Sequence, residues 1–319
     1  MKNLINYFFG KKASMGLSEA EKEPDTSAEI TEKEPAVIPL SSLADLNAVV
    51  VSDIGNVRRN NEDTGLFVRL ADEGIRRFKG YLLLVADGMG GHLAGEIASQ
   101  MAAEIVSREY FQYRDTIEKS LMRAFQLANR QIFDESIQSE RFRGMGTTCT
   151  AVVVHEEQLY FAHVGDSRAY LFKNGQLVQL TEDHTYVREL LRSGEITEEA
   201  AARHPERNVL MQAMGTKAEI RIDLGRCVLP FDPGDRLLLC SDGLYEYCQE
   251  EDLIRLLGQE VLPNVAAELV QVAKNRGGHD NITVVLAERI VAGDVLPPRE
   301  TREIEVNVPL TRDIERPNA

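Results

Sequence analysis

Residues 81–91 read YLLLVADGMGG, and the pattern of this segment recurs along the chain. An apolar run of this length, with a glycine at each end, is typical of a buried β-strand. Asp87 closes the run and stands beside Gly88, where a turn is expected to begin. Residues 94–110 then show helical periodicity. The segment therefore predicts a strand that carries a carboxylate at its end and leads into a helix.

Other apolar runs of strand length follow the same pattern, and two more segments have the periodicity of helices. The strands are predicted at 149–154, 159–164, 169–172, 236–240 and 282–287, and the helices at 117–133 and 263–274. The strands cluster without regular alternation with helices, which favours an antiparallel α+β or layered sandwich fold over a doubly wound parallel sheet.

Composition limits the possible functions. The net charge is −15, from 51 acidic and 36 basic residues, so nucleic acid is not expected as a partner, because its phosphates require a basic surface. The four cysteines form no C-x-x-C pair and are predicted to be buried apolar residues in a reducing compartment. Without a signal peptide or a membrane-spanning run, a cytoplasmic protein with no stable membrane insertion is expected.

The two ends of the chain differ from its centre. Residues 1–48 begin with MKNLINYFFGKK and continue into an acidic stretch, which predicts a flexible extension. The basic and aromatic start could alternatively bind weakly to a membrane surface or a partner. Residues 292–319 are rich in proline and charge and are predicted to form a tail. The segment between, 49–291, contains no linker-like break and is expected to be one domain.

Acidic residues stand at the ends of several predicted strands. Taken singly, each is a turn or cap residue. Strand ends can converge, however, and carboxylates gather only where cations neutralise them. Oxygen ligands without cysteine or paired histidine favour Mg²⁺ or Mn²⁺ over zinc. The acidic residues concerned are Glu62, Asp63, Asp87, Asp166, Asp242 and Asp280.

A carboxylate site with two cations suits hydrolysis of a phosphate ester. Cations about 4 Å apart bind the phosphoryl group and lower the pKa of a water between them. Arg58, five residues before Asp63, could add a bidentate contact to the phosphate, or could be an ordinary surface arginine. The glycine-rich DGMGGHLAG lacks the third glycine of a dinucleotide-binding loop, and no P-loop or G-x-S-x-G serine elbow occurs.

Together these segments resemble the type 2C metal-dependent protein serine/threonine phosphatases, the PPM family, in their bacterial form. The resemblance extends from Val51 to Ala287 and rests on motifs in family order: SDIGNVRRNNED, LLLVADGMGGHLAGEIAS, GMGTTCTAVVV, AHVGDSRAYLF, LVQLTEDHT, HPERNVLMQAMG, LLLCSDGLYE and GGHDNITVV. It implies a four-layer αββα sandwich, in which two central antiparallel β-sheets are flanked by helices.

The resemblance also implies roles for individual residues. Asp87 would bridge two catalytic metals, the Gly88 carbonyl would add a ligand, and Glu62 would lie just behind the ligands. Arg58 would bind the substrate phosphate. Asp166 with Asp242 would match a third metal position, and residues 184–215 would form a flap beside the site. The carboxylates that would hold the two catalytic metals, directly or through water, are Asp63, Asp87, Asp242 and Asp280.

One position departs from many eukaryotic relatives. Met89 stands where they carry the histidine proposed to protonate the leaving group, so a metal-bound water or His92 would have to do so. The histidines near the motifs are otherwise expected to be structural.

The expected function is hydrolysis of phosphoserine and phosphothreonine by a water activated between two Mn²⁺ or Mg²⁺ ions, with a third in some states. Phosphorylated proteins, including serine/threonine kinases, are the expected partners, and a monomer is expected. Two alternatives are a catalytically silent scaffold of the same fold and a two-metal hydrolase of small phosphate esters.

Overall fold

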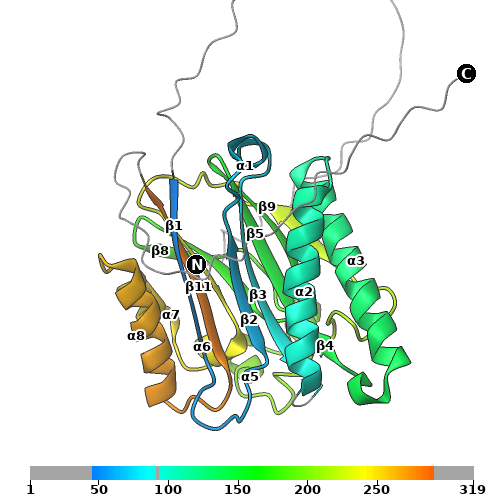
Figure 1. Ribbon diagram of the computed structural model, residues 1–319. Helices are drawn as coiled ribbons and strands as arrows, with labels where there is room; N and C mark the ends of the chain where they lie inside the picture. The colour runs from blue at the N-terminus through cyan, green and yellow to red at the C-terminus, as the bar shows by residue number, and fades with distance from the viewer. Residues whose placement is uncertain (1–44, 91–92, 291–319) are drawn as a thin grey trace, which may run out of the picture. The chain divides into compact units, whose positions relative to one another are not determined.

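The computed structural model describes residues 45–90 and 93–290, and their strands form two antiparallel sheets (Figure 1). The first sheet has the order β1 (Asp45–Asp53), β11 (Ile282–Ile290), β10 (Arg236–Cys240), β7 (Arg168–Lys173) and β8 (Gln176–Gln179). The second has the order β2 (Asp63–Val68), β3 (Tyr81–Met89), β5 (Cys149–His155), β6 (Gln158–Val164) and β9 (Asp223–Arg226), with β4 (Gly146–Thr147) paired to the end of β3.

Helices cover the outer face of each sheet (Figure 1). Helices α2 (Leu93–Gln112) and α3 (Ile117–Gln138) lie over the second sheet, and α7 (Glu250–Leu257) and α8 (Leu262–Asn275) lie over the first. The shorter helices are α1 (Glu73–Lys79), the 3₁₀ turn Glu140–Phe142, α4 (Tyr186–Ser193), α5 (Glu198–Ala201) and α6 (Asp242–Tyr245). The predicted four-layer αββα sandwich is confirmed.

The central strands are apolar on both faces because each lies between two layers. On β3, Leu82 and Leu84 pack against the helical side, whereas Leu83 and Val85 pack between the two sheets. Side chains alternate across a strand, so a strand buried on both faces needs an unbroken apolar run. Each fully buried leucine or valine stabilises the fold by about 1.5–3 kcal/mol.

Every strand and helix predicted from the sequence occurs, several with extra residues at one or both ends. All four cysteines are buried and free, as predicted. Residues 45–48, which the sequence assigned to the N-terminal extension, belong to β1, where Leu46 is buried and Asp45 pairs with Ile290. Residues 1–44 and the predicted tail 292–319 lie outside the described residues. In the described part of the chain, no helix combines the length and apolar character needed to cross a bilayer.

Candidate active site

Four aspartates from both sheets lie at one end of the sandwich, the lower end in Figure 1, near α6. Asp63 opens β2 and is paired in register with Asp87 on β3. Asp242 opens α6 directly after β10, and Asp280 lies just before β11, the neighbour of β10. The strand ends thus bring together the residues that the sequence placed in one site.

Burial and mutual repulsion raise the pKa values of these carboxyl groups. The pKa of Asp87 is raised well above its usual value, first by burial and then by the charges of Asp63 and Asp242. Burial likewise raises the pKa of Asp63 to about 6, although a hydrogen bond from the Ser241 hydroxyl opposes the shift. Like charges raise one another's pKa values only at close range. These shifts therefore indicate that the side chains of Asp63, Asp87 and Asp242 lie close together.

The site offers unpaired carboxylate oxygens that fit divalent cations. Asp63 Oδ1 and Asp242 Oδ1 are fully buried and have no hydrogen-bond partner. A buried oxygen of this kind is costly unless a donor or a cation satisfies it. Within residues 45–90 and 93–290, no group of three or more acidic, histidine or cysteine side chains is placed so that it could already hold a metal ion. The donor set is nevertheless entirely oxygen, which suits Mg²⁺ and Mn²⁺.

Asp280 is held by the arginine expected to bind phosphate. Arg58 Nη2 lies 2.6 Å from Asp280 Oδ2, and the two side chains are 48% and 32% exposed. Burial lowers the pKa of the guanidinium, but the hydrogen bond and charge of Asp280 outweigh it and raise the pKa of Arg58. Asp280 Oδ1 accepts a hydrogen bond from the Asn281 backbone. Arg58 is therefore at the site, with its guanidinium on a carboxylate.

Two glycines allow Glu62 and the end of β3 to approach α2 closely. A Cβ at Gly95 would lie 2.1 Å from Glu62 Oε2, and a Cβ at Gly88 would lie 2.1 Å from the Gly95 carbonyl oxygen. The Gly88 amide also donates to the Glu62 carbonyl at 3.1 Å. Glu62 is buried beside Asp63. The two glycines in DGMGGHLAG thus serve backbone packing here, and not a dinucleotide.

Asp166 lies in the turn between β6 and β7, with only 6% of its surface exposed. Burial, together with the charge of Asp183, raises the pKa of Asp166 to about 7. After burial, the charge of Asp166 is the largest cause of the raised pKa of Asp242. The charge of Asp166 thus acts on Asp242, one of the four aspartates, and these two residues are called the Asp166–Asp242 pair.

The expected flap, residues 184–215, forms one wall of a cleft of about 440 Å³ beside Asp166. It contains α4 and α5 and is attached at both ends: the His184 amide donates to the Gly165 carbonyl at 2.7 Å, and Met214 bridges Thr147. Asp166, the flap and the end of α6 line the cleft. A side chain entering it would meet Asp166.

Sequence analysis missed two polar residues that orient the site. The Ser241 hydroxyl donates to Asp63 Oδ2 at 2.7 Å and accepts from the Thr283 amide at 3.0 Å. Asn281 donates to the carbonyls of Ile54 and Asn60 and accepts from the Glu62 amide, which fixes the loop that carries Arg58. Both stand next to predicted aspartates, in SDG and HDN, and this adjacency was the available signal.

Neither Met89 nor His163 is suited to donate a proton to the leaving group. Met89 ends β3 and pairs with Gly146. His163 is fully buried, and burial lowers its pKa to about 3, so it is neutral and structural. His92 lies outside the described residues.

Comparison with known proteins agrees with this geometry. A family model of protein phosphatase 2C matches residues 71–286. A serine/threonine phosphatase of Listeria innocua is 39% identical over 250 residues, which cover 76% of this chain and 96% of the relative. The crystal structure of the Mycobacterium tuberculosis serine/threonine phosphatase PstP/Ppp is 35% identical with a TM-score of 0.69 and covers 78% of this chain and 100% of its own.

A further solved structure bears on the metal. The catalytic domain of a serine/threonine protein phosphatase PstP in complex with two manganese ions is 33% identical with a TM-score of 0.65, over 78% of this chain and 100% of its own. The fold and the oxygen-only site define a metal-dependent phosphatase. The chain belongs to the protein phosphatase 2C family, whose members act on serine and threonine phosphates with Mn²⁺ or Mg²⁺.

Proposed function

We propose that this phosphatase removes phosphate from phosphoserine and phosphothreonine of proteins, with two cations held by Asp63, Asp87, Asp242 and Asp280. The observation that carries the proposal is the pair of buried, unpaired oxygens on Asp63, which opens β2, and Asp242, which opens α6. When bound, Mn²⁺ or Mg²⁺ supplies an activated water and neutralises charge on the phosphate.

The chain's own residues bind, orient and shield the substrate. Arg58, exposed at the rim, exchanges its contact with Asp280 for the phosphate oxygens and can bind them with both ends of its guanidinium. Ser241 and Asn281 hold Asp63 and the Arg58 loop in place. The Gly88 carbonyl and Glu62 complete the metal surroundings. With methionine at position 89, the proton for the leaving alkoxide would come from a metal-bound water or from His92.

The Asp166–Asp242 pair is proposed to bind a third, weaker cation. Asp166 lines the cleft, and its charge raises the pKa of Asp242. A third cation held by these two carboxylates would take most of its ligands from water.

The surroundings of the cleft favour a protein substrate. The cleft is lined by both charges, which suits a peptide better than a small ester. In the flap, Arg188 Nη1 lies 3.8 Å from Glu198 Oε1, and Arg207 Nη2 lies 4.0 Å from Oε1 of Glu246, the residue after α6. Phosphoproteins of the cytoplasm, including serine/threonine kinases, are the proposed partners of a monomeric enzyme. Residues 1–44 and 292–319 are proposed as extensions of the catalytic domain, which begins with β1.

Phosphate release from a phosphothreonine peptide tests the function. Purified protein should release phosphate with Mn²⁺, and excess chelator should abolish release. Asp87→Asn should lose most turnover and still unfold cooperatively on heating, as a folded protein does. A small aryl phosphate in the same assay separates the two substrate classes: a higher kcat/KM for the aryl ester would favour a small-ester hydrolase. Full activity in chelator or in Asp87→Asn would contradict the two-metal site.

A further inference from the structure

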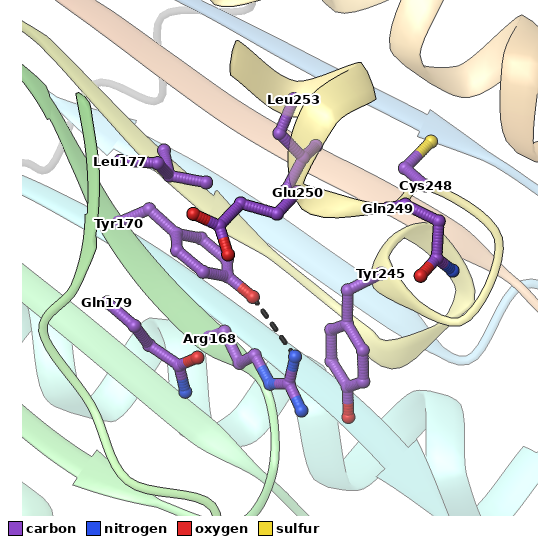
Figure 2. Close-up of a pocket in the computed structure, with 9 residues that line it drawn as sticks. All are labelled: Arg168, Tyr170, Leu177, Gln179, Tyr245, Cys248, Gln249, Glu250 and Leu253. Atoms are coloured by element: carbon purple, nitrogen blue, oxygen red, sulfur yellow. Dashed lines mark hydrogen bonds between the residues drawn. The ribbon is translucent and has the colours of Figure 1, made fainter. Parts of the chain in front are cut away.

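A second cavity lies next to the cleft, and the two share a wall made by Arg168 and Tyr245. The cavity has a volume of about 210 Å³ and is bounded by β7, β8 and the start of α7. Figure 2 shows the Arg168 guanidinium beside the Tyr245 ring, with Tyr170 on its other side. Arg168 and Tyr245 also line the larger cleft. Arg168 and Tyr245 therefore separate the cleft beside the flap from the cavity between the first sheet and α7.

Arg168 makes more directed contacts than a structural surface arginine needs. Its Nε and Nη2 donate to the two carboxylate oxygens of Asp183 at 2.9 and 2.6 Å, which is a bidentate pair. Its Nη1 donates to the Tyr170 hydroxyl at 3.1 Å. Its guanidinium carbon lies 3.6 Å from the centre of the Tyr245 ring. Planar stacking and bidentate pairing together require arginine and cannot be met by lysine.

These contacts connect three separate parts of the active site. Arg168 is two residues from Asp166 and opens β7. Tyr245 is three residues after Asp242 on α6. Asp183 is the residue before the flap, and we call its position the flap root. The first flap residue, His184, is fixed there because its ring nitrogen Nδ1 accepts a hydrogen bond from the Gly165 amide at 3.2 Å. One arginine thus joins the turn of Asp166, through its backbone, to α6 and to the residue before the flap, through its guanidinium.

Helix α6 depends on such a contact for its position. It has one turn, Asp242–Tyr245, and its N-terminal residue Ser241 makes no side-chain cap because its hydroxyl is bonded to Asp63. A single turn has little stability of its own, because helix nucleation is unfavourable. Its orientation, and with it that of the Asp242 carboxylate, is therefore set by tertiary contacts such as the stacking on Arg168.

We propose that Arg168 is a positioning residue that holds Asp166, Asp242 and the flap root in one arrangement. It acts through its contacts with Asp183 and Tyr245. Loss of the guanidinium plane should loosen the flap and weaken the third cation position, while the Asp63–Asp87 pair on the second sheet keeps its geometry. The part of the proposal that concerns the cation rests on the proposed function.

Hydrogen exchange of the metal-free protein tests the flap. Arg168→Lys keeps the charge and loses the plane and the fork. Amides of Tyr186–Ser193 should exchange about tenfold faster than in the wild type. Tyr245→Leu should give the same increase in exchange rate. Tyr245→Phe keeps the ring, so its flap amides should exchange as slowly as those of the wild type. This measurement needs no metal, so its result stands even if the proposed function fails.

Manganese titration by calorimetry tests the cation position. In Arg168→Lys the dissociation constant of the weakest manganese step should rise about tenfold or more, and the two tighter steps should weaken less, because of the residues that hold them only Asp242 depends on Arg168. Absence of any tight manganese step in the wild type would contradict the proposed function, not the role of Arg168 in the flap.

Arg236→Lys is the matched control. Arg236 also opens a strand of the first sheet and pairs with a carboxylate, Glu288, but at the end of β10 remote from Asp242. It should lower thermal stability without changing flap exchange or the weak manganese step. Wild-type flap exchange or an unchanged weak step in Arg168→Lys overturns the proposal, and so does the same response in Arg236→Lys.

Discussion

Arg58 has two competing partners at the rim of the site. Its guanidinium contacts Asp280, yet both side chains are well exposed, so the ion pair adds at most about 1 kcal/mol to stability. A cation bound at Asp280 Oδ2 would repel the guanidinium that hydrogen-bonds to the same oxygen. Arg58 is therefore free to leave Asp280 at little cost and bind a phosphate dianion.

Substitution of Arg58 should separate substrate binding from metal binding. Arg58→Ala removes a charge-assisted contact to phosphate, so KM for a phosphopeptide should rise about tenfold or more. Manganese affinity by calorimetry should stay the same or increase, since Asp280 loses a competitor. The exposed neighbour Arg59 provides the control, and Arg59→Ala should leave KM unchanged. An unaltered KM in Arg58→Ala would reduce Arg58 to a surface residue.

Ser241 should affect metal affinity although it is not a ligand. Ser241→Ala leaves Asp63 Oδ2 without its donor and the Thr283 amide without its acceptor. Unfolding free energy should fall by about 1–3 kcal/mol, and manganese affinity about 10–100-fold. Chemical denaturation and calorimetry measure the two effects. Ser241→Cys keeps a weak donor, so its unfolding free energy and manganese affinity should lie between those of the wild type and Ser241→Ala. A stability loss alone, with unchanged manganese affinity, would make Ser241 purely structural.

At the scale of elements, the sequence predicts what local pattern determines. Strands β3, β10 and β11 are unbroken apolar runs because both faces are buried. Strand β8, QLVQ, is short and partly exposed, and α6 is a single turn, so neither has a local pattern of its own.

The same distinction applies to the site. Aspartates after apolar runs could be predicted, because the run and the turn are neighbours in sequence. The role of Ser241 could not, because its partner Asp63 is 178 positions away and only the stacking of the two sheets brings them together.

The turn from β6 to β7 gives Asp166 its test. Asp166→Ala in an ordinary turn would cost about 1 kcal/mol of stability and leave the rate unchanged. If Asp166 holds the third cation, turnover on phosphopeptides at saturating Mn²⁺ should fall strongly, with the two tighter sites still filled. Glu157→Ala, in the turn at the opposite end of β6, is the control and should keep wild-type turnover. Wild-type turnover in Asp166→Ala would show that Asp166 is only a turn residue and holds no cation needed for turnover.

At the scale of the molecule, the limit of the catalytic domain lies at β1. This edge strand pairs with β11 along its whole length, from Asp45–Ile290 to Asp53–Ile282. Removal of residues 1–44 should leave thermal stability and turnover of a small phosphate ester unchanged. Removal of residues 1–53 should abolish folding, because β11 and the buried Leu46 side of the core lose their cover. Loss of stability in the shorter deletion would give residues 1–44 a structural role.

The stacked sheets bury more acid than the metal-free protein can keep charged. The pKa is raised to about 6 for Asp63 and about 7 for Asp166, and is raised for Asp87 and Asp242, all chiefly by burial. Unfolded aspartate titrates near pH 4. Between about pH 4 and 7, the folded metal-free protein therefore holds protons that the unfolded chain releases, and these groups lower stability as pH rises.

Manganese should reverse this dependence. Cations bind the charged carboxylates and displace their protons, so the gain in melting temperature on adding Mn²⁺ should grow from pH 5 to pH 8. His163, with its pKa lowered to about 3, contributes the opposite slope below pH 6.5. That contribution is present with and without metal, so the difference between two melting curves removes it. Asp87→Asn, which cannot ionise at that position, should flatten the dependence. A manganese increment that is equal at pH 5 and pH 8 would show that these carboxylates do not take up the cation.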